Sequence, residues 1–236
     1  MKQLALDLAV TPPSTLENFV PGRNGELLAQ LRRFAAGQPG ERFFYVWGSR
    51  DSGRSHLLKA VSAQLPGAAY VPCRPDTRFD AALQRASCIA LDDVERLDGD
   101  GQVAAFDLYN ALRERGGALI ASGSAPPVQL GLREDLVTRL AWGLVYQVHA
   151  LSDEEKTRAL DDRAASRGYR LPREVTDFLL KRVRRDLPSL IAMLDALDRY
   201  SLETKRPVTV PLVRELLHSA GAREAGSALR DSGGGR

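Results

Sequence analysis

A loop with two glycines, set between an apolar run and a helical pattern, constrains the fold more than any other feature of this sequence. Residues 43–47, Phe-Phe-Tyr-Val-Trp, are apolar throughout and predict a buried strand. The loop from Gly48 to Ser55 reads G-S-R-D-S-G-R-S, and residues 55–65 have helical periodicity. Between a strand and a helix, such a loop can surround a phosphate with backbone N–H groups. A simple glycine-containing turn is the alternative, but the context on both sides favours phosphate binding.

The loop follows the phosphate-binding pattern G-x-x-x-x-G-K-[ST] with one departure, because Arg54 stands in the lysine position. Arginine keeps the positive charge, yet its planar guanidinium is bulkier, so the exchange is not conservative. We expect phosphate binding to persist and hydrolysis to be weakened, since the lysine normally meets charge on the transferring phosphoryl group. Ser55 is placed to ligate Mg²⁺. The expected nucleotide-binding residues of this segment are Gly48, Ser49, Asp51, Ser52, Gly53, Arg54, Ser55 and His56.

Strand and helix patterns alternate up to residue 150. Further strands are predicted at residues 68–72, 88–91, 118–121 and 144–148. Helical patterns are found at residues 26–36, 55–65, 79–85 and 103–113. Such alternation is typical of a parallel sheet with helices on both faces, so we expect an α/β fold with a five-stranded parallel sheet.

Acidic and hydroxyl side chains follow the third and fourth predicted strands. Asp92 and Asp93 end the third strand; beside a phosphate loop, the first acid would hold Mg²⁺ indirectly and the second would orient the attacking water. Alone, two aspartates after an apolar run more often form an exposed turn. Ser122 and Ser124, after the fourth strand, each offer a hydroxyl for the γ-phosphate, and the sequence does not decide between them.

After residue 150 only helical patterns remain. Ser152 and Glu155 form a capping-box pattern at the start of the first helix, which ends near Gly168. Further helices are predicted at residues 172–183, 187–203 and 210–219, each with a proline near its start. We therefore expect an N-terminal peptide at 1–13, an α/β domain at 14–150, a helical domain at 151–219 and a disordered tail at 220–236.

Composition and charge exclude several classes of protein. Hydrophobic residues make up 44% and charged residues 27%, a balance typical of soluble globular chains. No apolar run approaches the roughly 20 residues that span a bilayer, and the first residues lack a signal-peptide core. Cys73 and Cys88 form neither a metal site alone nor a disulfide scaffold. We expect a cytoplasmic protein in a reducing compartment, with no membrane partner.

Basic residues are biased toward arginine, with 28 Arg and 5 Lys. High genomic GC content produces such a bias, and the rigid fork of arginine also suits phosphate recognition. The net charge is only +3, and the basic run at residues 181–185 is of a kind that usually forms a solvated helix face. We therefore expect any direct DNA binding to be minor.

The loop, the acid pair and residues 135–144, D-L-V-T-R-L-A-W-G-L, together resemble the AAA+ module of the family of the replication initiator DnaA. Residues 15–27 resemble the segment that packs against the adenine in this family, which implies contacts from Phe19 and Val20. Residues 184–190 match the part of the helical lid that carries a sensor arginine, and Arg185 fits best. The resemblance covers about residues 14–218. It implies an AAA+ core followed by a small all-helical lid, with ADP or ATP bound.

The resemblance also gives a role to Arg139. An AAA+ active site lies between subunits, and Arg139 matches the arginine finger that one subunit inserts into its neighbour's nucleotide site. An exposed helix arginine in a surface ion pair is the alternative. Asp93 would orient water if the chain hydrolyses its own nucleotide. Family members similar to this chain prefer ADP, which suits a loop altered at Arg54.

Residues 3–8, Gln-Leu-Ala-Leu-Asp-Leu, are similar to the hexapeptide by which bacterial proteins dock into the β sliding clamp of DNA polymerase III. Gln3 offers a donor and an acceptor, and Leu4, Leu6 and Leu8 alternate so that an extended peptide points them at one apolar surface. An edge strand or a frayed end is the alternative. Beside a DnaA-like module without a counterpart of the DNA-binding helix-turn-helix domain of that family, the pattern favours clamp binding.

This layout is similar to that of regulatory inactivators of DnaA within the family. It implies a negative regulator of replication initiation: the clamp-bound protein supplies Arg139 to ATP-bound DnaA, whose ATP is hydrolysed to leave inactive DnaA-ADP. It also implies self-association, and DNA contact mainly through the clamp at the nucleoid. Two alternatives stay open. One is an autonomous AAA+ ATPase or helicase loader that uses Asp93 for its own hydrolysis, and the other is a DNA-binding initiator paralogue.

Overall fold

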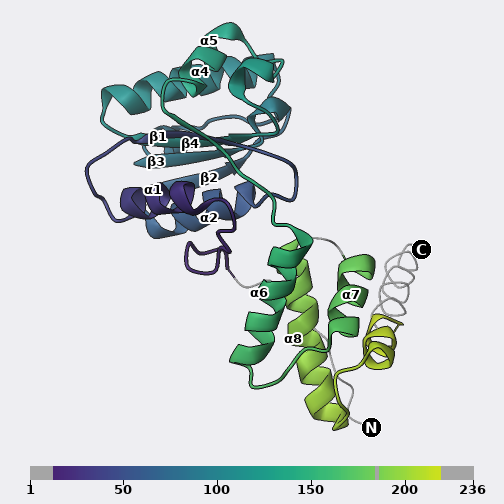
Figure 1. Ribbon diagram of the computed structural model, residues 1–236. Coiled ribbons are helices and arrows are strands. Elements are labelled where there is room, and N and C mark those ends of the chain that lie inside the picture. The colour runs from purple at the N-terminus through teal and green to yellow at the C-terminus, as the bar shows by residue number, and fades with distance from the viewer. Residues whose placement is uncertain (1–12, 184–185, 219–236) are drawn as a thin grey trace, which may run out of the picture. The chain divides into compact units, whose positions relative to one another are not determined.

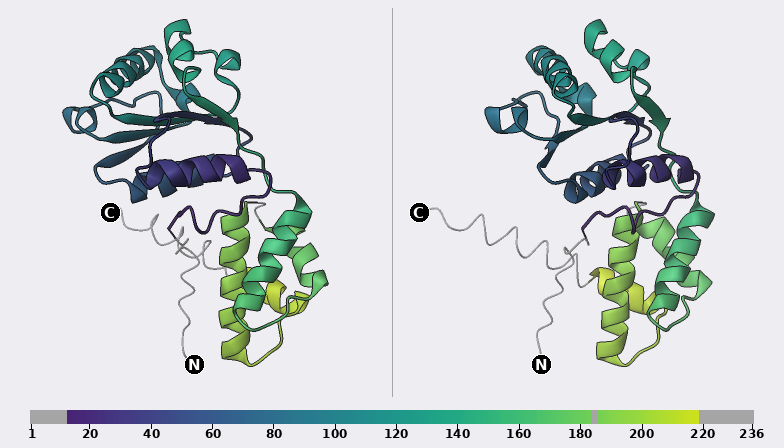
Figure 2. Two further views of the ribbon diagram at one scale, coloured as in Figure 1. Left: turned by 60° about the vertical axis from the view of Figure 1, so that its left-hand side comes forward. Right: turned by 90° about the vertical axis from the view of Figure 1, so that its left-hand side faces the viewer.

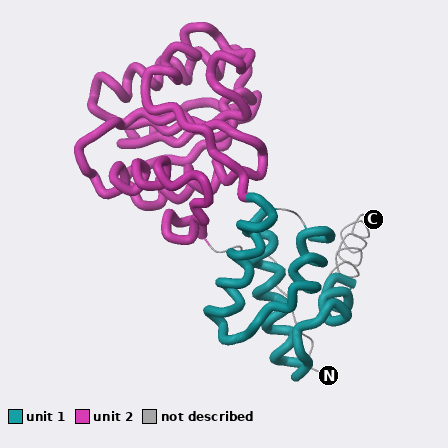
Figure 3. Tube along the Cα trace, in the orientation of Figure 1, with its two compact units in different colours: residues 1–12, 152–236 teal, residues 13–151 magenta. Residues whose placement is uncertain are grey.

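The computed structural model describes residues 13–183 and 186–218. These residues belong to two compact units, which meet in sequence at Leu151 and Ser152 (Figure 3). In chain order, the first unit (residues 13–151, magenta and marked unit 2 in Figure 3) contains the sheet and the phosphate loop. The second unit (teal and marked unit 1 in Figure 3) is helical in all the regular structure of its described residues. Gln3, Leu4, Leu6, Leu8 and Arg185 lie outside the described residues, as does the predicted tail.

The first unit is built on a five-stranded parallel sheet with the order β2-β3-β4-β1-β5. All four strand pairs are parallel, so the predicted fold class is confirmed. The two strands β3 and β4 are buried along their whole length, which explains why they read as continuous apolar runs in the sequence. The strands are β1 (Phe43–Trp47), β2 (Ala68–Pro72), β3 (Cys88–Asp92), β4 (Ala118–Gly123) and β5 (Leu144–Gln147).

Helices cover both faces of the sheet: α1 and α2 lie on one face and α4 and α5 on the other (Figures 1 and 2). Each face of the sheet has its own apolar core, and alternate residues of β1 point into different cores. Phe44 and Val46 pack with α1 and α2, while Tyr45 packs with α4 and α5. The helices are α1 (Gly25–Ala35), α2 (Arg54–Gln64), α3 (Ala81–Gln84), α4 (Gly99–Glu114) and α5 (Glu134–Leu140), with short 3₁₀ turns η1 (Val94–Arg96) and η2 (Pro127–Gln129).

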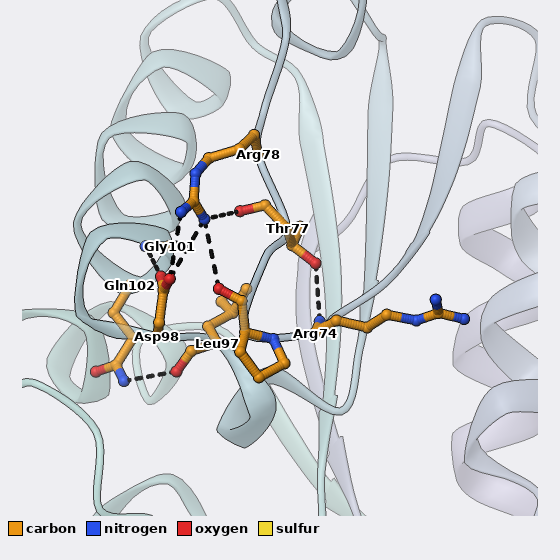
Figure 4. Close-up of polar contacts among 8 residues, drawn as sticks. Arg74, Thr77, Arg78, Leu97, Asp98, Gly101 and Gln102 are labelled. Atoms are coloured by element: carbon orange, nitrogen blue, oxygen red, sulfur yellow. Dashed lines mark hydrogen bonds and ion pairs between the residues drawn. The ribbon is translucent and has the colours of Figure 1, made fainter.

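Helices α3 and α4 differ from the predicted ranges. The pattern at 79–85 forms only one turn, capped by the Asp80 side chain and without a buried residue to extend it. By contrast, α4 begins four residues earlier than predicted, because the Asp98 carboxylate accepts a hydrogen bond from the Gly101 N–H at 2.7 Å. The Arg78 guanidinium contacts the second oxygen of Asp98 at 3.4 Å, so the loop before α3 is tied to the start of α4 (Figure 4).

The second unit is a helical domain with its own apolar core. Its first helix begins with the predicted capping box, in which the Ser152 hydroxyl accepts from the Glu155 N–H and the Glu155 carboxylate accepts from the Ser152 N–H. Arg163 of this helix and Arg167, its C-cap residue, both pair with Asp195 of α8 (Leu187–Thr204). Residues 210–218 are also helical. The named helices are α6 (Asp153–Ser166), α7 (Arg173–Arg182) and α8 (Leu187–Thr204). Within the described ranges, no helix is long and apolar enough to cross a membrane.

Candidate nucleotide-binding site

Two glycines shape the loop between β1 and α2. A Cβ on Gly48 would collide with the carbonyl oxygen of Val148, so this position requires a close approach of two backbones. Gly53 has φ +98°, in the left-handed region, and a Cβ there would lie 2.8 Å from the ring of Phe19. Glycine is therefore needed at both ends of the loop for geometric reasons, as a phosphate-binding turn requires.

Buried donors without a protein partner line this loop. The side chain of Arg54 is 7% exposed and that of Ser52 is 6% exposed. The Ser52 hydroxyl and the Nε and Nη1 groups of Arg54 have no hydrogen-bond partner. Leaving such groups unpaired costs about 1–3 kcal/mol each, and more for a charged group. A phosphate would accept from all of them, so the residues present fit a nucleotide phosphate.

The third nitrogen of Arg54 contacts the acid pair. Its Nη2 lies 3.1 Å from Oδ1 of Asp93, which has a left-handed backbone with φ 59°. Burial raises the pKa of Asp93, and the neighbouring Arg54 acts in the opposite direction by favouring the carboxylate. Arg54 therefore links the phosphate loop to the end of β3, and the carboxylate predicted to orient water is engaged in an ion pair.

Asp92 accepts hydrogen bonds on both of its oxygens. The Ser122 hydroxyl donates to Oδ1 at 2.5 Å, and the Tyr70 hydroxyl donates to Oδ2 at 2.6 Å. Ser122 also accepts from the Asp93 N–H at 2.9 Å. Ser124, the alternative in the sequence, is exposed, and its N–H donates to Glu95. Of the two serines, Ser122 is the one that lies at the acid pair.

The donor set also fits a magnesium ion. In the parts of the chain that the structure describes, no group of three or more His, Cys, Asp or Glu side chains could hold a metal. Magnesium beside a nucleotide needs only one or two protein oxygens, because phosphates and water complete its octahedron. Both residues predicted as ligands act on Tyr70, because its hydroxyl donates to Asp92 and the Ser55 side chain opposes the rise of its pKa.

Residues before α1 pack on the start of α2. Phe19 is 8% exposed and lies against Gly53 and the ring of His56, at 5.6 Å between ring centroids. The Nε2 of His56 is 2.9 Å from the Thr15 carbonyl oxygen. Val20 is partly buried. Phe19 and His56 are thus brought to the phosphate loop, whereas Ser49 and Asp51 lie exposed within it.

The partly buried His56 predicts a pH dependence of stability. Burial lowers its pKa below the reference value, while the hydrogen bond with Thr15 opposes this shift. The folded state then binds fewer protons than the unfolded chain, so the stabilising contribution is present above about pH 6.5 and is lost as the pH falls. Urea titrations should show the free energy of unfolding falling more steeply between about pH 7.5 and 5 for the native protein than for His56→Gln. Equal slopes would contradict this assignment.

Arg139 belongs to a group of residues on α4, on α5 and in the turn after α5, and its hydrogen bond and ring contacts are with this group. Its Nε–H donates to Oδ1 of Asn110 at 2.9 Å, and its guanidinium lies 4.3 Å from the Trp142 ring and 5.3 Å from the Phe106 ring. Trp142 is 54% exposed, and the Arg113 guanidinium lies 4.5 Å from the same ring. These five residues are called the Arg139 patch below. Arg139 forms no ion pair within the described residues, so the surface ion pair considered as its alternative role is not observed.

Tyr70 and Asn110 are the contacts that sequence reasoning missed. Each forms a long-range hydrogen bond with a predicted site residue. The Tyr70 hydroxyl donates to Asp92, and Asn110 accepts from Arg139. The position of Tyr70 near the end of a predicted strand was a usable signal, because the carboxyl ends of parallel strands meet at one edge of the sheet. Nothing local in the sequence marks Asn110.

A parallel sheet with a phosphate loop after β1, an acid pair after β3 and a helical domain after the sheet defines the AAA+ class. Residues 153–217 match the family described as Hda, lid domain. The helical unit of this chain therefore has the character of an Hda-type lid domain.

Solved structures share the fold over most of the chain. Domain III of the replication initiation protein DnaA from Thermotoga maritima aligns with a TM-score of 0.69 at 20% identity, over 88% of this chain and 98% of that one. A DNA replication initiation factor aligns with a TM-score of 0.63 at 22% identity, over 81% and 67%. AMPPCP-bound DnaA from Aquifex aeolicus aligns with a TM-score of 0.63 at 21% identity, over 78% and 65%. The AAA+ fold with a helical lid is thereby confirmed.

Proposed function

We propose that this chain is a negative regulator of replication initiation that supplies Arg139 as an arginine finger to ATP-bound DnaA. The observation that supports this most is that Arg139 is cationic, partly exposed and without an ion-pair partner in the described residues. Its guanidinium lies beside a half-exposed tryptophan and near a second arginine, Arg113. Such a concentration of unneutralised charge is complementary to a partner's nucleotide phosphates.

The chain's own nucleotide has a different role in this proposal. The unpartnered donors of Ser52 and Arg54 favour a bound phosphate, and the likeness to a DnaA solved with AMPPCP favours a nucleotide there. With Asp93 paired to Arg54, we expect intrinsic hydrolysis to be weak. Bound ADP, with or without Mg²⁺ at Ser55 and Asp92, then holds the chain in the shape that binds DnaA or a second copy of itself.

Residues 3–8 are proposed to tether the chain to the β sliding clamp, so that its contact with DNA at the nucleoid is mainly indirect. The clamp is loaded on DNA only after replication begins, which gives inactivation of DnaA its timing. Tethering also raises the local concentration of the chain near its target without any new contact. Arg139 could then act where newly initiated replication has left ATP-bound DnaA.

Reconstitution tests the proposal directly. DnaA carrying radiolabelled ATP is mixed with DNA-loaded clamp, ADP and this protein, and the label released as ADP is measured. We expect hydrolysis of the DnaA-bound ATP only when the clamp and this protein are both present. Absence of any stimulation would contradict the function, and equal stimulation with and without ADP would contradict the role given to the bound nucleotide.

The same assay without DnaA tests the main alternative, an autonomous ATPase or helicase loader. Asp93 keeps that reading open, although its ion pair with Arg54 disfavours it. Robust phosphate release by the chain alone, abolished by Asp93→Asn, would favour the alternative. Release near background in both proteins is the result expected here.

Clamp binding is tested by replacing Gln3 and Leu4 together with alanine. Loss of one buried leucine and of the amide hydrogen bonds should cost about 3 kcal/mol, or roughly 100-fold in affinity. Surface plasmon resonance on immobilised clamp measures this, with Gln38→Ala, an exposed glutamine after α1, as the matched control. Unchanged affinity of the double variant would remove the clamp as a partner.

A further inference from the structure

The Asp92 carboxylate is buried without a cationic partner among the residues that the structure describes. It is 5% exposed, and its side-chain hydrogen-bond donors are two neutral hydroxyl groups, those of Tyr70 and Ser122. In the same part of the chain, the neighbouring Asp93 is the member of the acid pair that forms an ion pair, with Arg54. A buried carboxylate is costly unless it is paired or coordinates a metal, so the charge of Asp92 favours a bound cation beside it.

Tyr70 holds one oxygen of this carboxylate. It lies on β2, the strand next to β3, two positions before Pro72, which stands opposite Asp92 in the parallel register. Its hydroxyl donates to Oδ2 at 2.6 Å, a short hydrogen bond of the kind made to an ionised acceptor. Ser122, on the strand at the other side of β3, donates to Oδ1. The carboxylate is thus fixed from both neighbouring strands, and each oxygen keeps a second lone pair for a further donor.

The same tyrosine lies against the face of α2 that carries Ser55. Lys59, one turn after Ser55 on that face, has its Nζ 5.3 Å from the centroid of the Tyr70 ring. Burial raises the pKa of Tyr70, and a hydrogen bond with the Ser55 side chain opposes this rise, as a donor to the phenolic oxygen does. The hydrogen bonds therefore run from Ser55 to Tyr70 and from Tyr70 to Asp92.

This direction suits a residue that ligates a metal ion. A serine hydroxyl has one proton and two lone pairs, and it ligates a cation through a lone pair. Because the oxygen of Tyr70 accepts the proton of Ser55, the lone pairs of the serine oxygen are left for a ligand. Hydrogen bonds from an outer shell of residues orient metal ligands in this way in many proteins.

We infer that Tyr70 is a positioning residue of the nucleotide site, which orients Ser55 and Asp92 so that ADP is bound together with Mg²⁺. The inference rests on the proposed nucleotide binding and adds the form of the ligand, a magnesium complex of a nucleoside diphosphate. Tyr70 acts through Ser55 and Asp92 and is not itself a ligand. Removing its hydroxyl should therefore weaken the binding of the metal and spare the binding of the nucleotide.

Paramagnetic Mn²⁺ in place of Mg²⁺ is the probe that tests this inference. Electron paramagnetic resonance of the ADP-saturated protein gives the affinity for Mn²⁺, and calorimetry in EDTA gives the affinity for ADP without metal. In Tyr70→Phe, we expect the Mn²⁺ affinity to fall by about 10- to 100-fold, the usual effect of losing an outer-shell partner. The ADP affinity in EDTA should not change, because the unpartnered donors of Ser52 and Arg54 remain available to the phosphates.

Tyr146→Phe is the matched control. The Tyr146 hydroxyl also donates to a carboxylate in the same unit, that of Glu26, at 3.0 Å, so this variant loses the same kind of hydrogen bond away from the acid pair. It should bind Mn²⁺ and ADP as the native protein does. Urea unfolding of both variants establishes that each is folded before its affinities are compared.

The outcomes separate the two levels of the proposal. If the native protein does not bind ADP, the proposed nucleotide site itself is wrong. If it binds ADP but the complex does not retain Mn²⁺, or if Tyr70→Phe retains Mn²⁺ as well as the native protein does, the nucleotide site stands and the positioning role of Tyr70 is overturned. An equal loss of ADP affinity in EDTA overturns that role as well, because Tyr70 would then support the phosphate loop instead of the metal ligands.

Discussion

Replacing Arg139 with alanine is expected to reduce the stimulated hydrolysis of DnaA-bound ATP by about 10³- to 10⁵-fold. An arginine finger has this effect because it neutralises the charge that develops on the γ-phosphoryl group, which no water molecule in the interface can match. Arg139 is available for this role, since its recorded contacts are to one amide and two aromatic rings. Single-turnover hydrolysis of labelled DnaA-ATP measures the loss.

A matched control lies on the same element. Arg133, at the N-cap of α5, is half-exposed and pairs with Asp135 at 2.9 Å. Such a surface pair contributes about 0–1 kcal/mol, so Arg133→Ala should fold and stimulate hydrolysis almost normally. Arg139→Ala should still bind clamp and ADP. If it loses either, Arg139 has a structural role and the finger assignment falls.

Replacing Arg54 with alanine is expected to weaken ADP binding by about 10²- to 10⁴-fold. The Nε and Nη1 groups of Arg54 are buried without partners, and each could donate a charge-assisted hydrogen bond to a phosphate. At about 1.5–3 kcal/mol for each such bond, two of them account for this range. Isothermal titration calorimetry with ADP gives the affinities.

Two further variants make the Arg54 result specific. Arg54→Lys keeps the charge at the same place and should retain most of the affinity. Arg50→Ala removes an exposed arginine from the same loop and should leave binding near its native level. Urea unfolding of Arg54→Ala is measured in parallel, because Asp93 loses its ion-pair partner. An unchanged ADP affinity in a folded Arg54→Ala would show that the phosphate loop binds its ligand without this side chain.

The strands could be predicted from the sequence to within two residues at their ends. Phe43–Trp47 and Cys88–Asp92 are buried on both faces of the sheet, so burial appears in the sequence as an unbroken apolar run. The sequence pattern places the start of α4 four residues too late, because Gly99 and Gly101 have poor helix propensity. The cap formed by the Asp98 side chain outweighs this low propensity. The residues at 79–85 have the periodicity of a helix but only partial burial, and one turn is all that forms.

In the candidate site, too, the sequence predicts the local features and does not predict the long-range contacts. The phosphate loop could be predicted because all of its determinants are contiguous, from the strand before Gly48 to the helix that begins at Arg54. The bond between Asn110 and Arg139 joins residues 29 positions apart, and that between Tyr70 and Asp92 joins residues 22 apart. Such pairs depend on how helices and strands are placed in three dimensions, which local periodicity does not encode.

Strand β1 contacts two functional segments of the chain, one at each of its ends. One end leads directly into Gly48, while at the other end the carbonyl of Phe43 leaves no room for a side chain on Gly143, next to Trp142. This five-residue strand therefore adjoins the phosphate loop at one end and the segment that carries Trp142 of the Arg139 patch at the other. A genetic screen that recovers loss-of-function alleles in β1 will find defects in both activities and will not separate them. Separation-of-function alleles should instead be sought in the loop itself, or on the outer surfaces of α4 and α5.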